Sequence, residues 1–207
     1  VTRNGVIKRT ALQAYKNTRS TGIIAINLDE NDELAFVKLT TGNEELLIAT
    51  KKGKSIRIDE NDAREMGRTA HGVRAIKLKA DDCVVGMTGI NNESVILTVT
   101  ETGYGRKSLS EDYRLQSRGG QGVTNYNTAK YGDDCTVMDV TDDDDIIRIA
   151  SNGIIIRIAA SEISTFSRPA KGVRVMRVAD GEKILSIVKA DHADEEELAE
   201  IEAEAEE

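Results

Sequence analysis

The chain repeats itself about every 50 residues. Each repeat contains a glycine that opens a short run, GIIAINL, GVRAIKL, GVTNYNT or GVRVMRV, and these glycines are Gly22, Gly72, Gly122 and Gly172. Other landmarks keep nearly the same step, because TRNG, KKG, TG and SNG begin near residues 2, 51, 102 and 151. A repeat of this length is a supersecondary unit that cannot bury its apolar face alone and stacks on its neighbours. The sequence therefore predicts four stacked units, over about 1–49, 50–99, 100–149 and 150–190.

Each unit carries four short apolar runs, which in the second unit are KSIRI at 54–58, GVRAIKL at 72–78, CVVGM at 83–87 and SVILTV at 94–99. Runs this short, rich in β-branched residues and separated by Gly, Asn and Asp, are typical of strands. Four antiparallel strands make up one propeller-like blade. The fold prediction is therefore all-β, a propeller-like array of about four blades.

The two ends of the array differ from its middle. The chain starts at a unit boundary, and the last unit runs into acidic residues at Asp191, where a fourth strand is expected. We therefore expect these blades to be the end of a longer array with exposed sheet edges. A closed ring of four blades is the alternative.

The net charge of −8 comes from the C-terminal segment. Residues 191–207 hold ten acidic side chains and no Lys or Arg, so 28 basic and 26 acidic side chains remain in residues 1–190. A segment this acidic, with almost no apolar stripe, is typical of a solvated, disordered tail.

Several classes of protein are not indicated by this sequence. No apolar run approaches the roughly 20 residues that a membrane span needs, and no signal-like segment precedes the first unit. Cys83 and Cys135 lack metal-ligand spacing, and His71 and His192 lack a catalytic Ser or Cys arrangement around them. We expect a cytoplasmic, soluble chain with no metal, no cofactor and no catalytic residue of its own.

A longer polar connection separates the first and second runs of each unit, and it places an arginine just ahead of the repeat glycine. These arginines are Arg19, Arg68, Arg118 and Arg168, joined by Lys16, Arg64 and Arg114. Because equivalent positions in stacked units lie on one rim, a curved basic stripe is predicted, as suits a protein that tracks a phosphate backbone. The alternative is that exposed strand ends simply carry charge. The stripe would be extended by Arg74, Lys77, Arg174 and Arg177, and along the first strands by Lys8, Arg9, Arg57, Arg106, Lys107 and Arg157.

The third connection, residues 116–122, is richer in glycine than the others. Gly122 is the repeat glycine, and a structural role is the expected one. Gly119 and Gly120 have other residues at the equivalent positions of the other units, so the fold does not demand glycine there. Two interpretations stay open: an anion-binding nest of backbone N–H groups, or a flexible loop.

Four segments, NGVIKRT, STGIIAINLDENDEL, REMGRTAHGVRAIKL and SRPAKGVRV, resemble the C-terminal domain of the A protein of bacterial DNA gyrase, and the resemblance covers nearly the whole chain. That family forms a β-pinwheel of about 50-residue blades, and this chain would be a fragment that lacks the first blades. The resemblance implies a non-catalytic, DNA-wrapping part of an ATP-dependent type II topoisomerase, with nucleoid-associated localisation. The implied partners are duplex DNA, the N-terminal part of the same polypeptide, which holds the catalytic tyrosine, and the ATPase subunit.

The family's wrapping motif reads Gln, basic, Arg, Gly, Gly, basic, Gly, and residues 116–122 resemble a weakened copy in which Ser117 and Gln121 replace the basic residues. Two rivals stay open: the related topoisomerase IV C-terminal domain, and a propeller that serves as a protein-interaction scaffold. The candidate DNA-binding residues are Arg19, Arg68, Arg74, Arg114, Gln116, Arg118, Gly119, Gly120, Gln121, Gly122, Arg168, Lys171 and Arg174.

Overall fold

The computed structural model describes residues 1–18, 20–168 and 170–191. Apart from single helical turns, its regular secondary structure consists of antiparallel strands, which confirms the all-β prediction. The strands are β1 (Val6–Ile7), β2 (Glu45–Thr50), β3 (Lys54–Asp59), β4 (Val73–Arg74), β5 (Val84–Ile90), β6 (Val95–Thr100), β7 (Tyr104–Leu109), β8 (Val123–Thr124), β9 (Asp134–Val140), β10 (Asp144–Ala150), β11 (Ile155–Ala159), β12 (Val173–Arg174) and β13 (Ile184–Asp191). Single helical turns are α1 (Thr128–Tyr131) and the 3₁₀ turns Leu12–Tyr15, Glu60–Asp62, Ser110–Asp112 and Ala160–Glu162.

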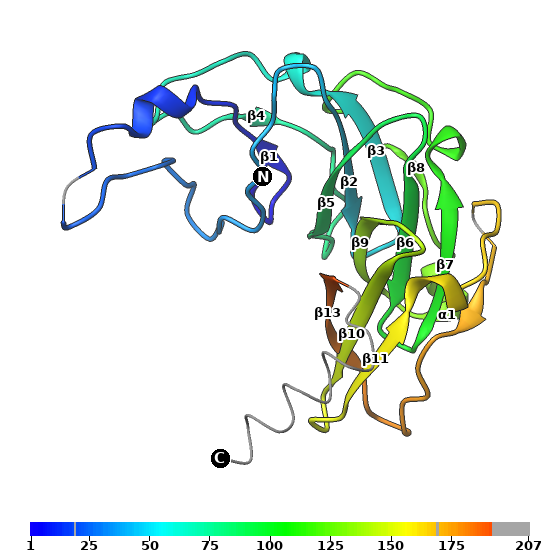
Figure 1. Ribbon diagram of the computed structural model, residues 1–207. Helices are drawn as coiled ribbons and strands as arrows, with labels where there is room; N and C mark the ends of the chain where they lie inside the picture. The colour runs from blue at the N-terminus through cyan, green and yellow to red at the C-terminus, as the bar shows by residue number, and fades with distance from the viewer. Residues whose placement is uncertain (19, 169, 192–207) are drawn as a thin grey trace.

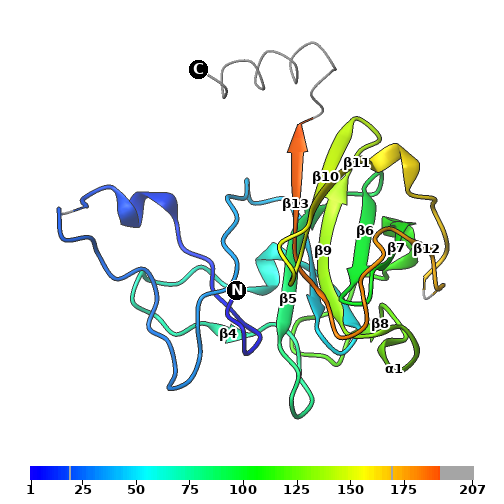
Figure 2. The same cartoon turned by 90° about the horizontal axis from the view of Figure 1, so that it is seen from below.

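The sheets follow one another around an open arc (Figures 1 and 2). Their strand orders are β5-β2-β3-β8, β12-β7-β6-β9 and β11-β10-β13, and β1 pairs with β4. We call β4, β8 and β12 the outer strands and β5, β9 and β13 the inner strands, because the inner strands pack against one another from sheet to sheet. Every outer strand is the start of a glycine-led run.

The four strands of one repeat do not form one sheet. In the sheet β5-β2-β3-β8, strand β2 comes from the first repeat, β3 and β5 from the second, and β8 from the third. Each outer strand thus pairs with the first strand of the preceding repeat, as Val123 with Ser55 and Val173 with Gly105. The expected content of a blade is therefore present, but its strands are drawn from three successive repeats.

Close backbone approach explains the repeat glycine in the later units. Gly122 has φ +69°, and a Cβ atom there would lie 2.3 Å from the carbonyl oxygen of Ser55. The same conflict occurs at Gly172, where a Cβ would lie 2.2 Å from the carbonyl oxygen of Gly105. Only glycine combines a left-handed backbone with contact this close. The structural role expected for Gly122 follows from this geometry.

The hydrophobic core is shared between sheets. One cluster joins Leu97 and Val99 of β6 to Ile146 of β10 and to Ile184 and Ile187 of β13. The apolar face of each sheet is thus covered by the next sheet, and no repeat in the described part of the chain has a core of its own. Folding of neighbouring repeats is coupled for this reason.

The first repeat contains less sheet than the sequence predicts. Its glycine-led run at 22–28 forms no strand, and residues 34–40 contribute only an isolated bridge between Leu34 and Thr2. The expected strand at 22–28 is therefore wrong, because such a run pairs with a preceding repeat that this chain does not supply. A groove of about 770 Å³ remains here, lined by side chains that include Leu34, Phe36 and Leu39.

The acidic tail predicted at 191–207 lies outside the described residues, apart from Asp191 at the end of β13.

Candidate nucleic-acid interface

The recurrent arginine ahead of the repeat glycine binds backbone carbonyls of the preceding repeat. Arg118 donates from Nε to the carbonyl oxygen of Asp62 at 2.9 Å and from Nη1 to that of Arg74 at 3.2 Å. Arg168 repeats the pattern, with Nε 3.0 Å from the carbonyl oxygen of Asp112 and Nη1 on that of Thr124. Arg68 likewise donates to the carbonyl of Ile24. These arginines therefore join neighbouring repeats, a role that sequence reasoning missed, and Arg19 lies outside the described residues.

The segment 116–122 lies along the glycine-led run of the second repeat. The N–H of Gly119 donates to the carbonyl of Ala75 at 2.6 Å, and the N–H of Lys77 donates to the carbonyl of Gly120 at 2.8 Å. Gly119 has φ +81°, so its backbone does favour glycine, contrary to expectation, whereas a Cβ on Gly120 would find its nearest atom at 3.7 Å. Because the Gly119 N–H is bonded within the chain, the nest interpretation loses one of its donors.

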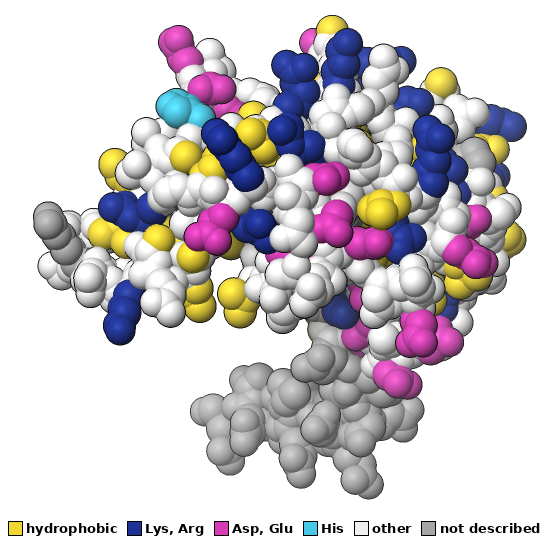
Figure 3. All heavy atoms as spheres, turned by 90° about the horizontal axis from the view of Figure 1, so that it is seen from above, with side chains coloured by type: hydrophobic (Ala, Val, Ile, Leu, Met, Phe, Trp, Pro, Cys, Tyr) yellow, Lys and Arg dark blue, Asp and Glu magenta, His cyan; other side chains and the backbone are white. Residues whose placement is uncertain are grey.

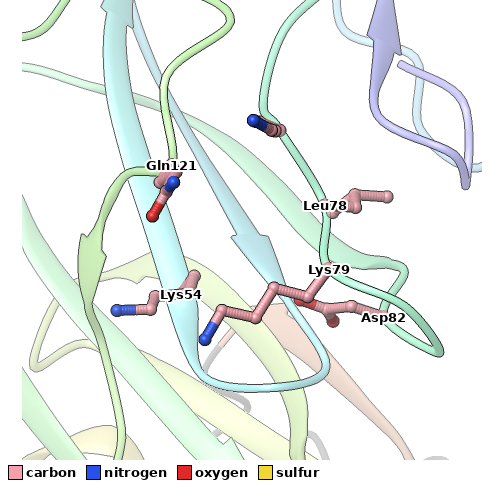
Figure 4. A pocket seen from close by; sticks show the side chains of 6 residues that line it. Lys54, Leu78, Lys79, Asp82 and Gln121 are labelled. Atoms are coloured by element: carbon pink, nitrogen blue, oxygen red, sulfur yellow. The ribbon is translucent and has the colours of Figure 1, made fainter.

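Beside this segment, lysines from separate elements surround a small hollow of about 50 Å³ (Figure 4). Lys54 begins β3, Lys79 follows the glycine-led run, and Gln121 comes from the 116–122 segment. Lys77 also lines the hollow, as does the carboxylate-bearing Asp82. Ammonium and amide groups around one opening can bind an anionic oxygen such as that of a phosphate.

The equivalent surface one repeat further along combines cations with tyrosines. The Nη2 of Arg174 donates to the hydroxyl of Tyr104 at 2.8 Å, and Lys171 Nζ lies 4.4 Å from the centre of the Tyr104 ring. Tyr131 packs against Tyr104 with ring centres 5.9 Å apart. Hydrogen bonds from Arg174 and then Lys171 lower the pKa of the Tyr104 phenol.

Some of the exposed cations lie on the outer strands or in the connections that precede them. Arg74 and Arg174 end the outer strands β4 and β12, and Arg114 lies in the connection that precedes β8. In the view of Figure 3, several Lys and Arg side chains lie along the centre and right of the upper edge, acidic side chains occupy its left end, and both kinds are present in the middle of this face. We call the following residues the outer-edge cations: Arg74, Lys77, Lys79, Arg114, Arg118, Lys171 and Arg174.

Comparison with known families accounts for this repeat arrangement. The family model described as "DNA gyrase C-terminal domain, beta-propeller" matches residues 1–41, 44–91, 94–151 and 144–191. The chain belongs to this family. The fold prediction of a gyrase-type β-pinwheel is thereby confirmed, with sheets that exchange strands between repeats.

Proteins with similar sequences are DNA gyrase A proteins, in agreement with the family model. The chain is 40% identical over 197 residues to the DNA gyrase A protein of Staphylococcus epidermidis, covering 94% of this chain and 22% of the relative. It is 41% identical over 199 residues to that of Salmonella typhimurium, covering 95% and 23%. The chain thus spans less than a quarter of the length of these relatives.

Two solved structures have the same fold. The C-terminal domain of DNA topoisomerase IV superposes with a TM-score of 0.87 at 27% identity, over 99% of this chain and 65% of that chain. A DNA gyrase A C-terminal domain superposes with a TM-score of 0.80 at 26% identity, over 91% of this chain and 64% of that chain.

Within this gyrase-family fold, the first-strand cations do not extend the stripe as predicted. Arg57, Arg106 and Lys107 are buried, with 6%, 0% and 5% of their surface exposed. Their strands lie inside the sheets, between an outer strand and a hairpin partner, and Arg106 and Lys107 are consecutive on β7, so side chains on both faces of this strand are covered. Arg57 donates to the carboxylate of Glu45 and to the carbonyl of Ser110, which anchors it there.

Arg106 belongs to a buried polar network within the third repeat. Its Nη2 donates to the carbonyl of Asn125 at 2.6 Å, and its guanidinium lies 4.4 Å from the centre of the Tyr126 ring. Asn125 accepts from the hydroxyl of Tyr113 at 2.9 Å and donates to Asp134 Oδ2 at 3.0 Å. Burial raises the pKa of the Asp134 carboxyl well above 3.8.

Asp134 should make stability depend on pH. Because its pKa is higher in the folded than in the unfolded chain, the folded chain holds the proton more tightly. The stabilisation is present below about pH 4 and is lost as the pH rises toward the raised folded value. Relative to the native chain, Asp134→Asn should therefore gain unfolding free energy as the pH rises from about 4 to 7, measured by urea denaturation at each pH. If the difference in unfolding free energy between Asp134→Asn and the native chain does not change with pH, the prediction is wrong.

Lys54, Lys79 and the tyrosine cluster were not predicted, because they lack the recurrence by which the other candidate residues were recognised. Lys54 is replaced by Tyr104 and by Ile154 in the next repeats, and Lys79 by Ala129. Lys79 directly follows the glycine-led run of its repeat, whereas Lys54 and Tyr104 pair with Thr124 and Arg174 of the next glycine-led run, a contact that the fold alone creates.

The structure indicates no site of another kind in its described part. Residues 1–18, 20–168 and 170–191 contain no group of three or more His, Cys, Asp or Glu placed to hold a metal ion. Over the same ranges, no helix has both the length and the apolar character needed to cross a membrane.

Proposed function

We propose that this chain binds duplex DNA along its outer edge and contributes to wrapping the duplex for a type II topoisomerase. The observation that supports this most is the recurrence of exposed cations on the outer side of a gyrase-family array, at Arg74, Arg114 and Arg174. Binding through phosphates is sequence-tolerant, since phosphate contacts position the duplex without reading bases.

The curvature of the array is part of the mechanism. Bending 20–30 bp of duplex by 40–90° costs on the order of 1–6 kcal/mol. A single exposed cation cannot offset this, but several phosphate contacts distributed along a rigid, curved edge can. In the whole protein, the bent duplex would present a chiral crossover to the ATP-driven strand-passage machinery, leading to negative supercoiling. The partners would be the N-terminal part of the same polypeptide and the subunit that hydrolyses ATP.

The candidate residues have different proposed tasks. Arg74, Arg114, Lys171 and Arg174 would contact phosphates directly. Arg68, Arg118 and Arg168 would act mainly by holding adjacent repeats in register, so that the phosphate contacts match the spacing along the duplex. Gly119 and Gly122 would keep the backbone of 116–122 close to the preceding repeat, while Gln116, Gly120 and Gln121 complete the surface of that segment.

Substitutions distinguish residues that contact phosphates from residues that hold adjacent repeats in register. Arg114→Ala should lower the affinity for a duplex of about 40 bp by roughly three- to tenfold without changing the thermal unfolding midpoint. Arg118→Ala should also lower the midpoint, because two carbonyls of the preceding repeat lose their donor. Affinity is measured by fluorescence anisotropy and unfolding by circular dichroism.

The control for this test is Lys189→Ala, a cation on the inner strand β13 whose ammonium lies 3.4 Å from Asp144. Its affinity for DNA should remain near that of the native chain. A native chain that does not bind duplex, or equal losses for Arg114→Ala and Lys189→Ala, would count against the proposal.

A further inference from the structure

Three of the five tyrosines of the chain meet at the boundary between the third and fourth repeats. The Tyr126 hydroxyl donates to the backbone carbonyl of Lys171. The ring centres of Tyr104 and Tyr131 lie 4.4 and 5.9 Å from the ammonium nitrogen of the same lysine. Tyr131 also packs against both other rings, with centres 5.9 Å from that of Tyr104 and 6.0 Å from that of Tyr126. The backbone and the side chain of Lys171 are thus both held by tyrosines of the preceding repeat.

Arg174 is held by the same tyrosines. Its Nη2 donates to the Tyr104 hydroxyl at 2.8 Å, and its guanidinium carbon lies 5.0 Å from the centre of that ring. Lys171 donates to the same hydroxyl, and these two hydrogen bonds, that of Arg174 first, lower the pKa of the Tyr104 phenol. Both cations are exposed, and each keeps further N–H donors for a ligand. One phenol oxygen therefore orders two cations that can still contact an anion.

The boundary between the first and second repeats pairs its strands in the same way but gives its arginine another neighbour. Arg74, which ends β4, lies opposite Val6 of β1. Arg174, which ends β12, lies opposite Tyr104 of β7. A valine side chain has no polar atom that could accept a hydrogen bond from a guanidinium. Arg74 and Arg174 are therefore a matched pair of exposed cations that differ in whether the opposite side chain can hold them.

The repeat fold does not require tyrosine at these positions. Lys54 and Ile154 stand where the third repeat has Tyr104. The turn that follows the glycine-led run is the helical turn α1 in the third repeat and ends on Tyr131, whereas the second repeat has Asp81 there. Strand pairing thus leaves these tyrosines unexplained, and their shared contact with Lys171 and Arg174 suggests what they do.

We propose that Tyr104, supported by Tyr131, is a positioning residue for DNA binding that holds Lys171 and Arg174 as a fixed pair of phosphate contacts. Because phosphate contact is itself part of the proposed function, this assignment rests on it. Immobilising a long side chain on binding weakens affinity by about two- to tenfold. Lys171 and Arg174 are already ordered before DNA arrives, so they should bind phosphate oxygens more tightly than equally exposed cations that rotate freely.

Substitutions of Tyr104 test this role. Tyr104→Phe removes the acceptor and keeps the ring, whereas Tyr104→Ile removes both and introduces the residue that the chain already has at the equivalent position 154. Affinity for a duplex of about 40 bp should fall about two- to threefold for Tyr104→Phe and about five- to tenfold for Tyr104→Ile. Fluorescence anisotropy measures the affinity, and circular dichroism verifies that each variant is folded.

A double-mutant cycle separates positioning from a structural role and from direct contact with DNA. In the background Lys171→Ala, Arg174→Ala, the change Tyr104→Ile should cause no further loss, because the cations that it positions are absent. In the matched background Arg74→Ala, it should cause its full loss, since Arg74 lies opposite Val6. A ring that only stabilises the fold, or that touches DNA itself, would lower the affinity equally in both backgrounds.

A measurement without DNA completes the test. NMR relaxation of the Nε–H groups should show less motion for Arg174 than for Arg74 in the native chain, and Tyr104→Ile should abolish this difference. A native chain that does not bind duplex would overturn the proposed function and this assignment with it. If the native chain binds, an unchanged affinity of Tyr104→Ile, equal losses in the two backgrounds, or equal motion of Arg74 and Arg174 would overturn the role of Tyr104 alone.

Discussion

Raising the salt concentration from 50 mM to 200 mM should weaken duplex binding by about a thousandfold, if about six phosphates are neutralised. Binding along the outer edge is proposed to depend on charge, and each neutralised phosphate contributes about −0.9 to the slope of log affinity against log salt. The expected slope is therefore about −5. Anisotropy titrations of one duplex at several salt concentrations measure it.

The double variant Arg74→Ala, Arg174→Ala tests whether the salt dependence arises from cations on the outer edge. Each substitution removes an exposed cation that ends an outer strand, so the magnitude of the slope should fall by about 2 for the pair. Lys189→Ala should leave the slope unchanged. Equal affinities at the two salt concentrations, or equal slopes for the double variant and this control, would mean that phosphate neutralisation on the outer edge is not what holds the duplex.

Gly122→Ala should lower the unfolding free energy by roughly 3–5 kcal/mol, which is a large effect for the addition of one methyl group. The added Cβ would lie 2.3 Å from the carbonyl oxygen of Ser55, and that strand cannot move away without breaking its pairing with β8. The φ of +69° adds the strain that an L side chain has in the left-handed region, about 1–2 kcal/mol. Urea denaturation measures the loss.

Two other glycines separate steric conflict from backbone strain. Gly120→Ala should be nearly neutral, because the nearest atom to its Cβ would be 3.7 Å away. Gly22→Ala should show the strain alone, about 1–2 kcal/mol, since φ is +78° but nothing lies within 4 Å. If Gly122→Ala and Gly22→Ala lose the same amount, contact between repeats is not the reason for the repeat glycine.

The repeat and the strand content could be predicted from the sequence because both are local properties. A period of 50 residues and short β-branched runs need no knowledge of partners. Which strand pairs with which could not be predicted in the same way, since every repeat offers equivalent strands. Pairing between Val123 and Ser55 crosses a repeat boundary, and only the three-dimensional arrangement chooses it.

The candidate site was predictable to a lesser extent. Periodicity located Arg118 and Arg168 correctly as recurring features, but the same periodicity is expected of residues that join repeats, and their hydrogen bonds to backbone carbonyls are of that kind. Nothing in the local sequence of Arg106 indicates burial, since the groups that contact its guanidinium, Asn125 and Tyr126, come from another segment of the chain. Lys54 and Lys79 meet only through the fold.

The exchange of strands between repeats also restricts how such a domain changes in length during evolution. Removing half a repeat would leave sheets with mismatched members, whereas deleting or duplicating one whole 50-residue module rejoins equivalent strands and restores each pairing. Lineages should therefore gain or lose blades as complete genetic units, with breakpoints free to fall at any matching position along the module.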